Sequence, residues 1–239
     1  RFRVLQLRAA GAQRRIGLGC AGDEAIEHAR QMAPRRRLEI IEREVAPQMA
    51  RDGRSFAVTV ANGRGIDELW IGTLGTRELR RLRAEPEADC SQPCWSPDLS
   101  RIAYRRTGRN ADDGIYVIPS AGGEARCVLR VGVSDTTWRP CGWFADGRSI
   151  LVWRSAQGRD ELLRLLVDGD RTLPVPFAPG ATNRRFARLS PDGTAIVYLG
   201  DETGQFECTA AALDAAGNMG TPVTLTSGGS NAAFWAPDG

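Results

Sequence analysis

The chain contains no lysine and only one histidine, His28, so all 32 of its basic residues are arginines. A single histidine cannot supply a metal site that needs several imidazoles. Without lysine there is no Gly-Lys-Ser/Thr phosphate-binding loop. The arginines are spread along the chain and balanced by 29 acidic residues, which leaves a net charge of only +3. A nucleic-acid partner is therefore not expected, because such proteins gather positive charge on one face.

Long apolar runs are also missing. No stretch approaches the roughly 18 apolar residues that a transmembrane helix needs, so we expect no membrane span within these residues. The chain opens at Arg1 without an initiator methionine or a signal-peptide pattern, and it ends at Gly239 in a turn. We therefore expect a piece of a longer protein. Glycine and proline are abundant, at 27 and 13 of 239 residues, which favours many turns and short strands.

One turn motif recurs around an aspartate at intervals of 46, 48, 46 and 46 residues. The five aspartates are Asp52, Asp98, Asp146, Asp192 and Asp238. A large apolar residue stands three positions before each of them: Met49, Trp95, Trp143, Leu189 and Trp235. Short apolar runs follow each turn, and four short strands in about 46 residues is the period of a β-propeller blade. Glycine usually follows the aspartate at a positive φ, so Leu99, which follows Asp98, predicts a turn that is either slightly different or strained.

We therefore predict an all-β protein, a β-propeller of four-stranded antiparallel blades. Arg3 to Leu7 matches the third strand of the later repeats and Arg14 to Leu18 the fourth. Asp23 to Ala33 has the pattern of a short helix that stops at Pro34. Because no second strand follows the last turn, we expect an open arc. The expected parts are a partial blade at 1–18, an insertion with the helix at 19–44, complete blades at 45–84, 90–131, 137–178 and 185–227, and the start of a further blade at 232–239.

The repeat resembles a known family. Cys94-Trp95-Ser96-Pro97-Asp98, followed by Ile115-Tyr116-Val117-Ile118 and Gly122-Gly123-Glu124, is similar to the WD40-like repeat of TolB-type β-propellers. The stretch from Arg188-Leu189-Ser190-Pro191-Asp192-Gly193 to Phe234-Trp235-Ala236-Pro237-Asp238-Gly239 is similar to propellers found C-terminal to bacterial serine/threonine protein kinases, beyond a membrane span. The same propeller type precedes the catalytic domain of prolyl oligopeptidases, follows winged-helix regulators and stands alone as periplasmic TolB.

The resemblance implies a non-catalytic sensor or interaction domain of a larger, membrane-anchored bacterial protein, foremost a serine/threonine protein kinase. Its partner would be a protein, a peptide or a small ligand at a propeller face or the channel mouth. The alternative is the substrate-gating propeller of a prolyl-oligopeptidase-type peptidase. An extracytoplasmic location follows from the resemblance, and a cytoplasmic one stays open. The oligomeric state is left open.

Candidate catalytic groups do not converge on a known chemistry, so we expect no enzyme activity, no cofactor and no metal. The recurring aspartates are needed in every blade, which indicates a role in the turns rather than in catalysis. Asp112-Asp113 and Asp168-x-Asp170 lack the ligand spacing of a calcium loop. The sequence has no Gly-x-Ser-x-Gly nucleophile elbow for which His28 could act as the base. Two acidic residues meeting at a channel mouth, as in glycoside hydrolysis, remain an alternative.

Cysteines and tryptophans leave two further questions. Cys90 and Cys94 lack the second pair that a zinc site needs. Cys94 and Cys127 stand at strand positions where buried apolar residues are expected. The alternative, in an exported domain, is a Cys90–Cys94 or a Cys127–Cys141 disulfide. Trp95, Trp143 and Trp235 share one phase of the repeat and are expected to pack between blades. Trp138 and Arg139 open a blade and are the candidates for a surface contact.

Overall fold

The computed structural model describes residues 4–7, 47–76, 78–108, 112–131, 136–169, 173–178, 180, 182–190 and 192–235. All regular elements in these ranges are strands, and none of the described residues belongs to a helix that could cross a membrane. The insertion expected at 19–44, with its helix and His28, lies outside the described residues. The chain divides into two compact units: Gly17–Ser134, here the β2–β9 unit, and Arg1–Ile16 with Asp135–Gly239, here the β10–β18 unit.

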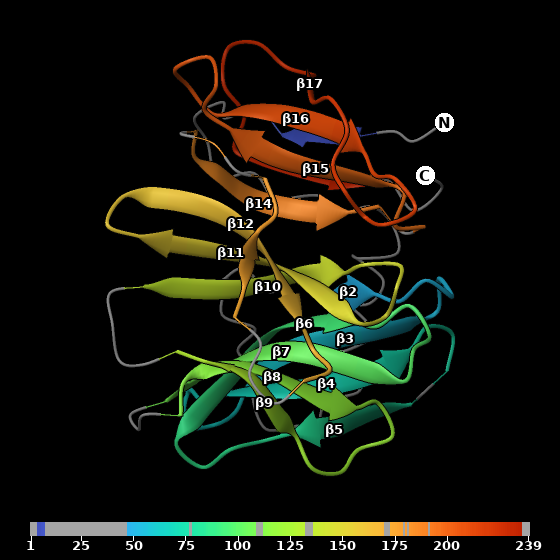
Figure 1. Ribbon diagram of the computed structural model, residues 1–239. Coiled ribbons are helices and arrows are strands. Elements are labelled where there is room, and N and C mark those ends of the chain that lie inside the picture. Colours follow the sequence, from blue (N-terminus) through green and yellow to red (C-terminus); the bar gives the residue numbers. More distant parts are fainter. Residues whose placement is uncertain are drawn as a thin grey trace. The chain divides into compact units, whose positions relative to one another are not determined.

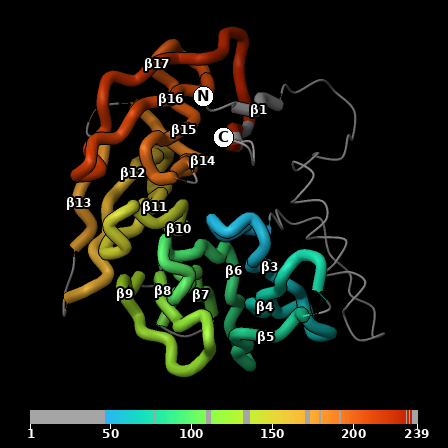
Figure 2. Tube along the Cα trace, turned by 90° about the vertical axis from the view of Figure 1, so that its right-hand side faces the viewer, coloured from blue at the N-terminus to red at the C-terminus, as the bar shows by residue number. Residues whose placement is uncertain are grey.

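The β2–β9 unit holds two four-stranded antiparallel sheets in which strands consecutive in sequence are paired (Figures 1 and 2). The first sheet has β2 (Gln48–Met49), β3 (Ser55–Ala61), β4 (Asp67–Thr73) and β5 (Leu79–Arg83). The second has β6 (Ala88–Trp95), β7 (Arg101–Gly108), β8 (Gly114–Pro119) and β9 (Arg126–Arg130).

Apolar side chains of both sheets form one core in this unit. Ala57, Leu69 and Ile71 from the first sheet lie in the same buried cluster as Ile102 and Tyr104 from the second. The alternation of the strands explains this, because successive side chains point to opposite faces and every second residue can reach the neighbouring sheet. The two blades are thus held face to face by aliphatic and aromatic packing.

The β10–β18 unit repeats the arrangement. One sheet has β10 (Thr137–Trp143), β11 (Ser149–Ala156), β12 (Arg159–Leu166) and β13 (Val175–Pro176). The other has β14 (Arg184–Leu189), β15 (Ala195–Gly200), β16 (Glu207–Ala212) and β17 (Val223–Thr224). Their common core includes Leu151, Leu162, Ile196 and Tyr198. The prediction of an all-β protein with four four-stranded antiparallel blades of a β-propeller is confirmed.

The terminal strands correct two expectations. β1 (Val4–Leu7) pairs antiparallel with β18 (Ala232–Trp235) in a two-stranded sheet, whereas we had expected the two ends to remain apart. Val4 lies opposite Trp235, as Ile102 lies opposite Trp95, so β1 occupies the register of a second blade strand and not of a third. The pairing satisfies backbone groups that would otherwise be exposed along both strands.

Candidate functional site

The recurring aspartates accept hydrogen bonds from residues of their own turns. Asp52 Oδ1 accepts hydrogen bonds from the backbone N–H groups of Arg54 and Ser55, at 2.9 and 2.8 Å. Asp146 Oδ1 does the same with the N–H groups two and three residues later, at 2.8 and 3.1 Å. Asp192 Oδ1 accepts the N–H of Thr194 at 2.9 Å. These contacts give the aspartates a role in closing hairpins, the role that the repeat predicts.

Asp98 shows how strongly such a turn holds its carboxylate. The Ser96 hydroxyl donates to Oδ1 at 2.6 Å, and Ser100 donates its backbone N–H at 3.1 Å and its hydroxyl at 2.7 Å. The hydroxyl donors of Ser96 and Ser100, followed by the Ser100 N–H, lower the pKa of Asp98 to about 2. This carboxylate is therefore ionised throughout the neutral range and cannot act as a general acid. The fifth aspartate, Asp238, lies outside the described residues.

Trp138 and Arg139 lie on β10, where each makes a contact with an aromatic or cationic neighbour. The Arg154 guanidinium lies over the Trp138 ring at 5.5 Å, and that of Arg139 lies over Trp153 at 5.0 Å. Both residues are half-buried. Part of each side chain is thus used in packing, and a role as a surface contact stays a prediction.

The described members of the carboxylate pairs, Asp112, Asp113 and Asp168, do not assemble a metal site. Asp113 Oδ1 accepts the N–H of Gly108 at 2.6 Å and so closes the β7–β8 loop, and Asp112 pairs with Arg130. Asp168 is exposed, and Asp170 lies outside the described residues. In the part of the chain that the structure describes, no three His, Cys, Asp or Glu residues are grouped so that they could hold a metal ion.

The described cysteines are free thiols: Cys90, Cys94, Cys127, Cys141 and Cys208. Neither the Cys90–Cys94 nor the Cys127–Cys141 bridge is formed. Burial, followed by the charge of Glu85, raises the pKa of Cys90 to about 12, which keeps it protonated. These cysteines, apart from the half-buried Cys127, behave as small core residues.

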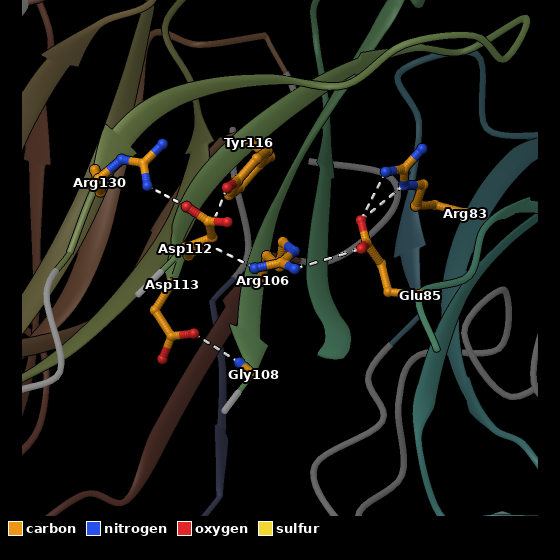
Figure 3. Close-up of polar contacts among 8 residues, drawn as sticks. All are labelled: Arg83, Glu85, Arg106, Gly108, Asp112, Asp113, Tyr116 and Arg130. Carbon is orange, nitrogen blue, oxygen red and sulfur yellow. Dashed lines mark hydrogen bonds and ion pairs between the residues drawn. The ribbon is translucent and has the colours of Figure 1, made fainter. Parts of the chain in front are cut away.

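A polar network that the sequence analysis did not identify lies in the β2–β9 unit (Figure 3). Glu85, between β5 and β6, accepts hydrogen bonds from Arg83 Nε and Nη2 on Oε1, at 3.0 and 2.7 Å. Its other oxygen accepts from Arg106 Nη2 at 3.4 Å. Glu85 thus ties the last strand of one blade to the second strand of the next.

Arg106 extends this network to the β7–β8 loop. Its Nη1 donates to the backbone carbonyl of Asp112 at 2.9 Å, and the Tyr116 hydroxyl donates to the same carbonyl at 2.9 Å (Figure 3). The Asp112 carboxylate is paired with Arg130. A chain of alternating charges therefore crosses the second blade at one end of its strands.

Glu85 also borders a groove of about 530 Å³ in the same unit. The groove is lined by residues 62–64 and 66 of the β3–β4 loop, by Glu68 of β4 and by residues 84–86 between β5 and β6. The network and the groove escaped the sequence analysis because Glu85 lies between two repeats, and its partner Arg106 lies 21 residues later at a strand position that carries no residue common to all repeats. The one available signal was the closeness of an arginine and a glutamate in Arg83-Ala84-Glu85.

No protein-family model and no curated protein sequence matches the chain. Solved structures do. TolB from Acinetobacter baumannii is 15% identical, with a TM-score of 0.58 over 75% of this chain and 43% of that one. A putative TolB from Agrobacterium tumefaciens is 19% identical, with a TM-score of 0.59 over 77% of this chain and 62% of that one.

Prolyl oligopeptidase B from Galerina marginata, in a structure with a 35mer hydrolysis and macrocyclization substrate, is 12% identical, with a TM-score of 0.56 over 76% of this chain and 27% of that one. The chain thus spans less than two thirds of the proteins that it resembles. At these identities the likeness concerns the fold alone. The chain has a β-propeller fold similar to that of TolB proteins.

Proposed function

We propose that the chain is a non-catalytic binding domain that recognises a protein, a peptide or a small ligand through a propeller face. The observation that carries this proposal is the use of the recurring carboxylates. Asp52, Asp98, Asp146 and Asp192 all accept hydrogen bonds from their own hairpins, which leaves them as parts of a rigid frame. A rigid frame that presents loops and a groove is what a recognition module needs.

The domain would belong to a larger bacterial protein, foremost the extracytoplasmic region of a membrane-anchored serine/threonine protein kinase. Support comes from the motif between Arg188 and Gly239, with its Ser-Pro-Asp-Gly turn and terminal Trp-Ala-Pro-Asp-Gly. The second candidate is the substrate-gating propeller of a serine peptidase. The likeness to prolyl oligopeptidase B, of which the chain spans 27%, favours that candidate.

The coding sequence on either side of this chain distinguishes the two candidates. An upstream kinase catalytic loop and a single apolar span support the kinase context. A downstream Gly-x-Ser-x-Gly elbow, followed by an aspartate and a histidine, supports the peptidase.

Turnover by the purified chain tests the non-catalytic part of the proposal. We expect no hydrolysis of ester, peptide or glycoside substrates, with or without divalent metal ions. Activity that disappears on replacement of one Asp or Glu, in a variant that still folds, would overturn the proposal.

A further inference from the structure

The loop between β3 and β4 presents unused hydrogen-bond donors at the groove. Asn62 holds this loop, because its side-chain oxygen accepts the N–H groups of Arg64 and Ile66 at 2.9 and 3.2 Å. Within the described residues, neither the Arg64 guanidinium nor the Gly63 N–H has a hydrogen-bond partner, and both residues are exposed. A fixed loop thus offers a cation and a backbone donor to the groove.

The two glutamates that line the groove are already neutralised. Glu68 accepts hydrogen bonds from Asn62 Nδ2, Trp70 Nε1 and Arg81 Nη1, at 3.3, 3.2 and 3.5 Å. Glu85 accepts three from Arg83 and Arg106, as described above. Their side chains are only 9% and 15% exposed. A cationic ligand would have to displace these donors, so the groove does not favour one.

Arg83 comes directly before the lining residues Ala84 and Glu85 and keeps one unused donor. Its Nε and Nη2 are used by Glu85, but no described residue accepts a hydrogen bond from Nη1, and 35% of the side chain is exposed. Arg83 itself does not line the groove, but it is paired with Glu85, which does.

We propose that the groove binds an extended acidic peptide segment, with a carboxylate of the peptide on Arg64 and the Gly63 N–H. Ile66, Ala84 and Pro86 supply apolar contacts for the peptide chain. Charge complementarity identifies this occupant, because the only charged group lining the groove without a side-chain partner among the described residues is the Arg64 guanidinium. The inference rests on the proposed binding function and names its surface and the chemistry of its partner.

Fluorescence anisotropy with labelled peptides tests the inference on the full chain. The probe is fluorescein-labelled Gly-Glu-Val-Glu-Gly-amide, and the matched controls carry Gln or Lys in place of both Glu residues. We expect the Glu peptide to bind, with an affinity that falls between about 50 mM and about 300 mM salt because exposed ion pairs are screened. We expect the Gln and Lys peptides to bind at least about fivefold more weakly.

Three variants assign the binding to this groove. Arg64→Gln should weaken binding of the Glu peptide about fivefold, the effect of losing one exposed ion pair. Arg54→Gln, at the other end of β3, is the matched control and should change nothing. Glu85→Gln should strengthen binding severalfold, because Arg83 and Arg106 lose their internal carboxylate. A merely structural role for Glu85 would predict weaker binding.

The inference is overturned if the Glu peptide shows no binding up to about 1 mM, if the Gln peptide binds equally well, or if Arg64→Gln and Arg54→Gln behave alike. Binding of the Lys peptide alone would also overturn it while leaving the proposed binding function intact. The non-catalytic part of the proposed function is tested separately, by measuring substrate turnover with the same purified chain.

Discussion

Leu99 takes the position in the β6–β7 hairpin that Gly147 takes in the β10–β11 hairpin, and both have a positive φ, 61° and 63°. Gly53 and Gly193 hold the same position in the remaining blades, at 65° and 74°. The turn therefore keeps its shape whether or not glycine is present. A residue with a Cβ is strained in this region, by about 1 to 2 kcal/mol. Of the two outcomes expected from the sequence, a different turn or a strained one, the positive φ of Leu99 fits the strained turn.

Replacement of Leu99 by glycine should stabilise the protein by about 0.5 kcal/mol, because relief of the strain exceeds the entropy that glycine adds to the unfolded chain. The reverse change, Gly147→Ala, should destabilise by about 1 kcal/mol, although no atom lies within 4 Å of the new Cβ. Urea unfolding of both variants measures the two effects. A destabilised Leu99→Gly variant would show that the packing of the leucine side chain outweighs its strained backbone.

The same comparison shows what a repeat can and cannot predict. The hairpin residues recur in every blade, so their spacing predicted the sheets and the role of Asp98 in its own turn. β1 was assigned to the wrong strand because Val4 to Leu7 carries no turn aspartate that would set its register. The network of Glu85 and Arg106 depends on contacts between segments that occur once. Periodicity therefore predicts the frame of a propeller and not the contacts that occur only once in it.

Asp98 should make stability depend on acid pH. Its pKa in the folded state is about 2, below the ordinary value of 3.8, so its contribution is present above about pH 4 and is lost as the pH falls toward 2. Asp98→Asn should therefore unfold at lower urea than the parent at pH 7, and the difference should shrink progressively between pH 4 and pH 2. A difference that stays constant down to pH 2 would mean that the ionised carboxylate is not what Ser96 and Ser100 stabilise.

Arg164 should be a large contributor to the stability of the β10–β18 unit. From β12 its guanidinium donates to Asp146 Oδ2 at 2.8 Å, to Ser149 Oγ at 2.9 Å and to the Ala216 carbonyl of the neighbouring sheet at 2.8 Å. It also lies over the Phe144 ring at 4.4 Å. Arg164→Ala should lower the free energy of unfolding by about 2 kcal/mol, since a charged, partly buried group and its acceptors lose their partners.

Arg148→Ala is the control for Arg164, because Arg148 stands in the β10–β11 hairpin that Arg164 contacts and has an exposed side chain. We expect its effect to stay within about 0.5 kcal/mol. Equal effects of the two substitutions in urea unfolding would contradict the assignment of Arg164 as the link between the sheets.

Cysteine labelling should separate Cys127 from Cys90 in the native protein. Cys127 is half-buried, whereas Cys90 is wholly buried and has its pKa raised to about 12 by burial and by Glu85. Because the thiolate is the reactive form, iodoacetamide at about pH 8 should modify Cys127 at least about tenfold faster. Peptide mass spectrometry locates the label, and the protein in urea, where the two sites should react alike, is the control. Equal labelling of Cys127 and Cys90 in the native protein would show that the Cys90 thiol is not buried. A Cys90–Cys94 disulfide in the non-reduced digest would show that the thiol is not free, since a bridged sulfur cannot be alkylated.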